Sequence, residues 1–441
     1  MKIVMTSAIA LAVAAGAAHA GGIERSNNDY GFLFTRNDQL QLSFSHVMPE
    51  LSGKYSPELT AAGGGEGSTG NMLNDYSNYS LAYKNDFTEK LTFGMYVNNP
   101  YGAGAEYTQG IYAGLTADWD SNQIALVGKY RVSDRVSVFA GARYVESEAD
   151  ITIPDLLVRS SVGRNAQGIG AQAQALGAEA QALGAQAQAA GAAGDLATAQ
   201  ELGAQAQALG AQAQALGAQA QTLGAAAQDF GTSMEYNASG RRVGDWGAIL
   251  GVAYGIPDIA LRVALSWQSE ITHTFSTSET IAGLGIDATG GDTKVTMPQA
   301  VALDFQTGIA PGTLVFGQVK WVEWSKWEVR TPEYEGVTGG NVTGFDNDRT
   351  TWKLGIGRAF SEDLSGFAQV SYEAQNGDTV SRLAPRDGFV SIGVGGQYKM
   401  DNMTLRGGLE YAWIGDAEDA SGTKFEDNTA LGVGVSLTVD F

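Results

Sequence analysis

Leu431-Gly432-Val433-Gly434-Val435-Ser436-Leu437-Thr438-Val439-Asp440-Phe441 ends the chain with an apolar residue at every second position. Successive side chains of a β-strand point to opposite faces, so this segment predicts one apolar face and one face of Gly, Ser, Thr and Asp. It is longer than the strands of most soluble sheets and suits a tilted crossing of a bilayer. The stretch therefore favours a membrane barrel over a soluble β-sandwich.

The same alternation recurs along most of the chain, for example from Val136 to Tyr144 and from Met403 to Trp413. Aromatic residues such as Tyr130 and Tyr254 stand at strand ends, as in the aromatic girdles of membrane barrels. Fourteen strands are predicted, an even number, as bacterial single-chain barrels have. They cover 38–48, 74–85, 90–99, 111–131, 135–152, 242–255, 258–275, 293–309, 312–329, 349–361, 363–375, 387–400, 402–415 and 428–441.

The connections between these strands alternate in length. Short turns such as Val132-Ser133-Asp134 alternate with long connections, and 100–110 is intermediate. This is the pattern of short periplasmic turns and long extracellular loops, and it places both termini in the periplasm. The fold class predicted is an all-β transmembrane barrel of 14 antiparallel strands over 38–441. The long connections are 49–73, 153–241, 276–292, 330–348, 376–386 and 416–427.

The first twenty residues predict a signal peptide. Lys2 precedes an apolar run, and Ala18-His19-Ala20 is a small-x-small cleavage site, so residues 1–20 are expected to be removed. The chain carries 27 basic and 48 acidic residues, a net charge of −21, which argues against nucleic acid as a partner. It has no Cys, which excludes disulfides and thiol chemistry.

Enzymatic chemistry is not expected. After the signal peptide only His46 and His273 remain, and the sequence gives neither an evident Ser or Asp partner. A Gly-x-Ser-x-Gly elbow, which would indicate a lipase or protease, is lacking. Because no nucleotide or phosphate motif is present either, no cofactor and no metal site are predicted.

Residues 166–230 break the strand pattern with a seven-residue repeat of Gly-Ala-Gln-Ala-Gln-Ala-Leu. An apolar residue every seven positions predicts a coiled coil, and Ala190-Gly191-Ala192-Ala193-Gly194-Asp195 resembles a helix stop and turn. The prediction is an α-helical coiled-coil hairpin inserted in the third extracellular loop, between strands 5 and 6. The alternative is a disordered tract, because each interior Gly costs about 1 kcal/mol relative to Ala.

Six short motifs occur in order along the predicted strands. They are Asn99-Pro100-Tyr101-Gly102, Gly244-Asp245-Trp246-Gly247, Lys294-Val295-Thr296-Met297-Pro298-Gln299, Trp321-Val322-Glu323-Trp324-Ser325-Lys326-Trp327, Asp348-Arg349-Thr350-Thr351-Trp352 and Ala384-Pro385-Arg386-Asp387. Together they resemble those of the outer-membrane long-chain fatty acid and hydrocarbon transporter family (OMPP1/FadL/TodX). A terminal Phe441 on an alternating strand also resembles the signal read by the barrel assembly machinery.

The resemblance implies a monomer that passively transports long-chain fatty acids or similar hydrophobic compounds, captured at the extracellular loops. It implies a plug before the first strand, here a reduced plug segment at 21–37 that lacks an Asn-Pro-Ala stretch. It also implies lateral release into outer-membrane lipid through a kink in the third strand. Asn99, Pro100, Tyr101 and Gly102 suit that kink, since Pro lacks a donor for the strand ladder. The alternative is an ordinary strand end.

The alternation of side chains between the two faces of each strand predicts that six cationic residues point towards the lumen. Arg or Lys would bind a fatty acid carboxylate well. Arg143, Lys320, Lys353 and Arg262 are the predicted substrate-binding residues, with Arg143 and Lys320 preferred because they lie in the middle of long strands. Lys129 and Arg406 complete the set. The alternative for each is a network of lumen charges with Glu410, Glu373 and Asp304 as partners.

The projecting hairpin leaves a second function open. The chain could be an outer-membrane adhesin or surface-interaction protein, in which the barrel is only an anchor. Loss of uptake on deletion of 166–230 would assign the hairpin to transport, whereas loss of surface attachment alone would favour the adhesin.

Overall fold

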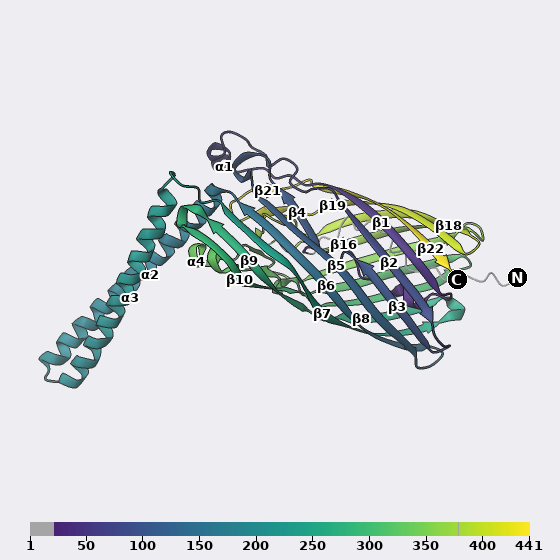
Figure 1. Ribbon diagram of the computed structural model, residues 1–441, viewed down its shortest axis with the longest axis horizontal. Helices are drawn as coiled ribbons and strands as arrows, with labels where there is room; N and C mark the ends of the chain where they lie inside the picture. The colour runs from purple at the N-terminus through teal and green to yellow at the C-terminus, as the bar shows by residue number, and fades with distance from the viewer. Residues whose placement is uncertain (1–21, 378) are drawn as a thin grey trace.

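A computed structural model describes residues 22–377 and 379–441 as a closed barrel with a long helical hairpin at one end (Figure 1). Within these residues the wall has fourteen strands, three of which are interrupted, into β3 and β4, β8 and β9, and β10 and β11. The last strand pairs with the first from Thr429↔Glu50 to Asp440↔Gln39, which closes the ring. The predicted fold class is confirmed. The predicted signal peptide, residues 1–20, lies outside the described residues.

The wall segments are β1 (Gln39–Glu50), β2 (Tyr76–Asp86), β3 (Leu91–Asn98), β4 (Gly102–Glu106), β5 (Thr116–Arg131), β6 (Val136–Ile153), β7 (Tyr236–Ile256), β8 (Leu261–Gln268), β9 (Ile271–Ile281), β10 (Ile286–Met297), β11 (Ala300–Ala310), β12 (Thr313–Val322), β15 (Arg349–Ala359), β16 (Leu364–Glu373), β18 (Phe389–Met400), β19 (Met403–Ile414) and β22 (Thr429–Asp440). Outside the wall lie α1 (Pro57–Ala62), α2 (Asp155–Ala192), α3 (Leu196–Gln228), α4 (Pro332–Thr338) and the short strands β13 (Glu328–Val329), β14 (Thr343–Gly344), β17 (Thr379–Val380), β20 (Ala417–Asp419) and β21 (Lys424–Phe425). None of the helices in the described ranges has the length and hydropathy of a membrane span.

The strand alternation has the predicted faces. On β22, Leu431, Val433 and Val435 point outwards and are 38–45% exposed, whereas Ser436 points inwards and is 2% exposed. Exposed aliphatic side chains recur around the ring, and exposed aromatic side chains such as Tyr398 and Trp413 lie near strand ends. This apolar outer band is the surface by which a barrel contacts lipid.

The loops at the hairpin end pack into a cap over the barrel. Its core includes Leu51, Met72 and Phe425, all buried and drawn from loops far apart in sequence. Tyr112 donates from its hydroxyl to Asp419 Oδ2 over 2.6 Å, and Arg382 Nε donates to the same oxygen over 3.1 Å. Because Asp419 binds groups from two other loops, the cap is a connected layer.

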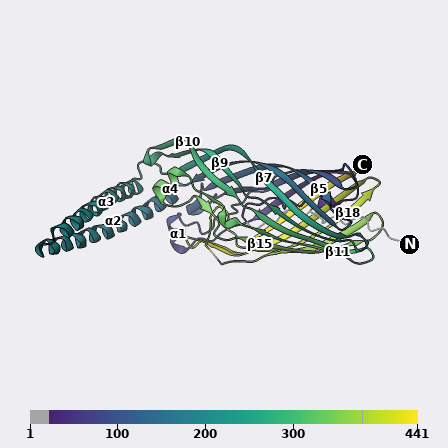
Figure 2. The ribbon, with the colours of Figure 1, turned by 90° about the horizontal axis from the view of Figure 1, so that it is seen from below.

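The predicted helical hairpin is confirmed, with longer helices than the repeat alone (Figures 1 and 2). α2 starts at Asp155, because Leu157, Val158 and Val162 pack into the cap. The turn falls where predicted: Gly194 has φ +85°, and Asp195 caps α3 by accepting from Thr198 N–H over 3.1 Å.

One side chain holds the base of the hairpin together. Arg159, on the first turns of α2, is 5% exposed and donates to Asp155 Oδ2 over 2.6 Å. It also donates to the carbonyls of Ala226, Asp229 and Thr232 at the end of α3, over 3.2, 2.6 and 2.5 Å. A cation at the last carbonyls satisfies groups that a helix end leaves unpaired. The hairpin is therefore attached to the barrel through a fixed base.

One predicted loop is wrong. Residues 276–292 were expected to be a long connection, but β9 runs to Ile281, β10 starts at Ile286, and a tight turn at Ala282–Leu284 joins them. These strand ends stand above the apolar band, where Thr274 and Ser276 point outwards, so the apolar alternation stops although the strand continues. For the same reason β6 and β7 continue to Ile153 and from Tyr236, beyond their predicted ends.

Candidate functional site

The segment before β1, residues 22–37, lies inside the barrel. Its Tyr30, Phe32 and Leu33 are buried against inward side chains of the wall, among them Val127 and Phe139. Gly94 on β3 leaves the space for this packing, because a Cβ there would lie 2.9 Å from the Phe32 ring. The segment therefore has the position that a plug requires.

Three of the lumen cations predicted by parity hold this segment. Lys320 pairs with Glu24 and also donates to the Asn27 carbonyl over 3.3 Å. Arg262 stands 5.1 Å from the Phe34 ring centroid and 3.5 Å from the Gly31 carbonyl. Lys129 lies over the same ring at 5.0 Å. In this structure these cations contact the plug segment.

The other three predicted cations also face the lumen. Arg143 is fully buried, and its guanidinium donates to Gln268 Oε1 over 2.9 Å, to the Ser269 carbonyl over 2.8 Å and to the Tyr101 hydroxyl over 3.3 Å. Arg406 binds Gln397 Oε1 over 2.9 Å. Lys353 lies half-buried between the outward Trp352 and Leu354. The six are spread around the lumen and do not converge on one point.

The third strand is interrupted at the predicted kink. β3 pairs with β2 as far as Asn98↔Ser80, and the same register reappears only at the single bridge Ala105↔Leu73. Residues 99–104 and 74–79, between these points, form no ladder with each other in the described strands, although each segment still has strand pairing on its other side. We call this opening the kink slit.

The plug segment fills the kink slit with its backbone. Arg25 N–H donates to the Pro100 carbonyl over 2.9 Å, and Gly102 N–H donates to the Ile23 carbonyl over 2.8 Å. The Arg25 side chain covers Gly102 and stands 4.4 Å from the centroid of the Tyr76 ring. The groups that the broken ladder leaves unpaired are thus partly satisfied by the plug segment.

An aromatic cluster, which the sequence analysis missed, lies beside the kink slit. Trp119 stands 5.4 Å from Phe275 and 6.0 Å from Trp327, and Trp324 stands 6.2 Å from Tyr101. A cavity of about 40 Å³ borders it, which holds little more than a water molecule, so a larger guest must displace side chains. The cluster is Tyr101, Trp119, Phe275, Trp324, Trp327 and Phe345. The Trp321–Trp327 motif was its only signal in the sequence.

His273 has the partners that the sequence did not reveal. Its Nδ1 lies 2.8 Å from Asp245 Oδ2, and its Nε2 lies 3.2 Å from Ser147 Oγ. The sequence shows no evident Ser or Asp partner for this His, because the fold brings the three residues together from three different strands, β6, β7 and β9. The arrangement of Asp245, His273 and Ser147, with the imidazole between the carboxylate and the hydroxyl, is that of a hydrolase triad. Ser147 is only 1% exposed, however, so its hydroxyl is not open to a substrate.

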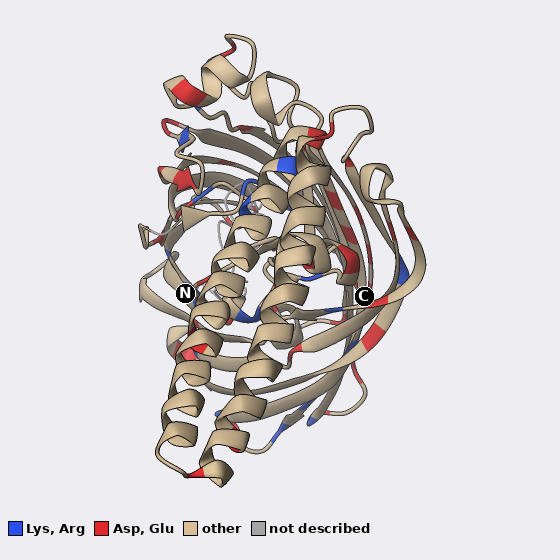
Figure 3. Ribbon diagram, turned by 90° about the vertical axis from the view of Figure 1, so that its left-hand side faces the viewer, with Lys and Arg blue, Asp and Glu red and all other residues tan. Residues whose placement is uncertain are grey.

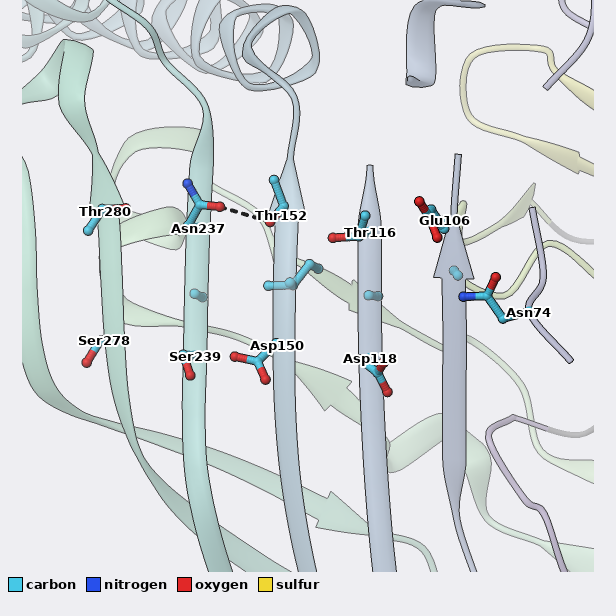
Figure 4. A pocket seen from close by; sticks show the side chains of 14 residues that line it. Asn74, Glu106, Thr116, Asp118, Asp150, Thr152, Asn237, Ser239, Ser278 and Thr280 are labelled. Carbon is cyan, nitrogen blue, oxygen red and sulfur yellow. Dashed lines mark hydrogen bonds between the residues drawn. The ribbon is translucent and has the colours of Figure 1, made fainter. Parts of the chain in front are cut away.

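A polar groove of about 420 Å³ lies on the outer face of the wall, near the base of the hairpin (Figure 4). Asp118, Asp150 and Ser239 project into it from neighbouring strands, and Thr152 donates to Asn237 over 2.8 Å. Trp119, next to Asp118 in sequence, points the other way, into the aromatic cluster. The groove is lined by carboxylates, hydroxyls and amides together with the apolar side chains of Ala105, Ala117, Ile151 and Ala238.

The comparisons with known proteins agree with this geometry. A sequence model of the family described as outer membrane protein transport protein (OMPP1/FadL/TodX) matches residues 4–436. The chain belongs to this family. Its barrel is accordingly an outer-membrane barrel, as predicted. No match was found among curated proteins.

Solved structures of the OMPP1/FadL/TodX family share the fold. A FadL homologue from Pseudomonas aeruginosa is 12% identical, with a TM-score of 0.63 over 98% of each chain. The toluene transporter TodX from Pseudomonas putida is 14% identical, with a TM-score of 0.57 over 96% of this chain and 95% of that one. At such identities the likeness establishes the fold alone.

Proposed function

We propose that this chain carries long-chain fatty acids or similar hydrophobic compounds passively across the outer membrane and releases them laterally through the kink slit. The observation that carries the proposal is the kink slit itself, which is closed by a plug segment and not by a continuous strand ladder. An intact ladder has no gap for an acyl chain, whereas withdrawal of residues 23–25 would leave one at Pro100.

The aromatic cluster supports the same proposal. It adjoins both the plug segment and the kink slit, because Trp324 packs on Ile23 and on Tyr101. Hydrophobic guests bind best where apolar and aromatic surface is shielded from water. Cargo would be gathered at the extracellular loops, held at the cluster, and released once the plug segment moves. The relative TodX is a toluene transporter, which agrees with a hydrophobic cargo.

The lumen cations have two roles in this proposal. Arg143, Arg262, Lys320 and Lys353 offer charge to a fatty acid carboxylate, and Arg262 and Lys320 also bind the plug segment. A carboxylate that competes for Lys320 would weaken its pairing with Glu24 and so favour plug movement. The chain acts as a monomer without enzymatic activity, and the 64% exposed Phe441 remains available to the barrel assembly machinery.

The test restores the ladder at the kink. We expect Asn99→Val/Pro100→Thr to allow β3 and β4 to join into one strand, so that uptake of a radiolabelled long-chain fatty acid falls to the level of barrel-free cells. The matched control is Val132→Thr/Ser133→Ala, in a turn on the other side of the membrane. Unchanged uptake by a well-folded kink variant, judged by heat-modifiable gel migration, would reject lateral release at this place.

The hairpin supports a second candidate, a role in surface attachment. It extends far beyond the barrel, and Figure 3 shows almost no charge along it. Contacts such as Gly170–Ala220 and Gly191–Ala199 define its register. Deleting 174–187 together with 203–216 removes two repeats from each helix in that register and shortens the hairpin by about 21 Å at 1.5 Å per residue. Normal uptake with lost surface attachment would support this role, and lost uptake would assign the hairpin to transport.

A further inference from the structure

The barrel wall has a second interruption, between β7 and the strand formed by β8 and β9. β7 pairs with β9 from Tyr236↔Ile281 to Gly240↔Thr277, and with β8 from Ile249↔Gln268 to Ile256↔Leu261. Between these ladders, residues 241–248 and 269–276 form no ladder with each other in the described strands. We call this opening the side slit. Each of its edges is still paired on its other side, β7 with β6 and β9 with β10.

The side slit results from one extra residue on each edge. The β6–β7 register shifts where Ser147 pairs with Val243 but Ala149 pairs with Gly240, which leaves an additional residue on β7. On the opposite edge the inward face changes from even positions such as Gln268 to odd positions such as Ile271. The two insertions offset each other, so the strands rejoin in their original register. Because a bulge disrupts the ladder locally, two bulges at opposite ends keep it open between them.

Side chains close most of the side slit, and one backbone hydrogen bond closes its lower end. Ile271 packs against Gly247, where a Cβ would lie 2.8 Å from Ile271 Cγ1, and Phe275 packs against Gly240 in the same way. Between them His273 crosses the gap to Asp245 and to Ser147, over 2.8 and 3.2 Å. At the lower end Ser269 N–H donates to the Ala248 carbonyl over 3.0 Å. Rotation of three side chains would open the wall without breaking a strand ladder.

The side slit connects the aromatic cluster with the outer edge of the apolar band. On the inside, Phe275 belongs to the cluster and contacts Trp119. On the outside, Trp246 is 65% exposed, with Thr272 and Thr274 above it. The two slits are also linked through β5 and β6, because Ser121, which accepts from Tyr101 N–H at the kink slit, pairs with Ser147, which faces His273 at the side slit.

We propose that the side slit is a second lateral passage for hydrophobic cargo, between the aromatic cluster and the outer leaflet, with His273 as its gate. This proposal rests on the proposed transport function. An elongated compound with a polar end fits the passage, because Ile271 and Phe275 line it inside and Thr272, Thr274 and Arg242 stand at its mouth. The kink slit is filled by the backbone of the plug segment, whereas the side slit can open while the plug segment stays in place.

A disulfide across the side slit tests this passage. The chain has no Cys, so Gly247→Cys/Ile271→Cys introduces one defined pair. The 2.8 Å between the Gly247 Cβ position and Ile271 Cγ1 limits the Cβ–Cβ distance to the range that a disulfide spans, about 3.5–4.5 Å. The control, Ala253→Cys/Ala264→Cys, places the same bond between directly paired residues of β7 and β8.

The assay is uptake of a radiolabelled long-chain fatty acid by vesicles that contain the full-length barrel. We expect the oxidised Gly247→Cys/Ile271→Cys variant to lose most of its uptake and to regain it after reduction, while the control variant transports equally in both states. Full uptake by the oxidised Gly247→Cys/Ile271→Cys variant, with the bond verified by mass spectrometry, would overturn the side passage and leave the proposed transport function standing. If the unsubstituted protein carries no more of the fatty acid than empty vesicles do, the transport function fails, and the side passage with it.

Substitution of the gate gives a second measurement. His273→Ala removes both hydrogen bonds that the imidazole makes across the slit, so we expect faster uptake with the barrel retained. His273→Gln can keep one of these bonds and should lie closer to the unsubstituted protein. A merely structural role for His273 predicts a less stable barrel with no gain in uptake, and that result would refute the gate.

Discussion

Replacing Lys320 by Met should release the plug segment. Lys320 and Glu24 form an ion pair whose side chains are 5% and 9% exposed, so the change leaves a carboxylate buried without its partner. Breaking a buried pair from one side costs roughly 3–5 kcal/mol. Since about 1.4 kcal/mol corresponds to a factor of ten, the ratio of displaced to seated plug should rise by roughly two to three and a half orders of magnitude.

Single-channel conductance in a planar bilayer measures this change directly. We expect Lys320→Met to show more frequent or longer open events than the unsubstituted protein. The double variant Lys320→Met/Glu24→Met replaces both charges by apolar groups, which is often close to neutral, and should return the conductance towards its original level. If the single and double variants conduct alike, the pair does not hold the plug and the reasoning is refuted.

Three further predictions concern the outer parts of the molecule. Arg159→Met should weaken the hairpin base by roughly 1.5–3 kcal/mol, because hydrogen bonds from a charged donor are lost. Amide hydrogen exchange at 226–234 should therefore accelerate. The control Arg164→Met should change the exchange little, because its partners Ser160 and Ser161 lie in its own helix. Gly184→Ala and Gly210→Ala should each stabilise their helix by about 1 kcal/mol, since a Cβ at either position meets no neighbour within 4 Å, and slower amide exchange in the hairpin would show it. In the cap, burial raises the pKa of Tyr55 to about 12 and also raises the pKa of Tyr112. The folded cap therefore holds these protons more tightly than the unfolded chain does, so its stability should be complete below about pH 10 and fall towards pH 12; proteolysis of the loops should increase over that window, and an unchanged rate would contradict the prediction.

Much of the barrel could be predicted because its outer surface meets lipid. Contact with lipid demands apolar side chains at alternate positions, as at Leu431, Val433 and Val435, and that demand is visible in the sequence. In the strand ends that stand above the lipid, alternate positions are no longer required to be apolar. Strand residues such as Thr274 and Ser278 are polar on the outside, so the region around Ile281 was assigned to a loop although the ladder continues there.

The site was less accessible to sequence reasoning. Parity placed Arg143 and Lys320 in the lumen, but the groups they contact depend on how the plug segment folds, and that segment has no periodic pattern. The side slit depends on two single-residue insertions that offset each other. Each insertion moves the inward face of its strand by only one position, as from Gln268 to Ile271, and such a shift does not by itself show that the ladder between two strands is interrupted.

The hairpin register has a consequence for the reach of the hairpin. Each seven-residue unit of α2 lies opposite a unit of nearly the same sequence on α3, and the contacts of α2 with the cap reach only as far as Ile169, where the units begin. A gain or loss of one unit in each helix would keep the register and move the tip by about 10 Å at 1.5 Å per residue. The barrel, the plug segment and both slits would be unaffected. The number of units therefore sets the reach of the hairpin independently of the barrel.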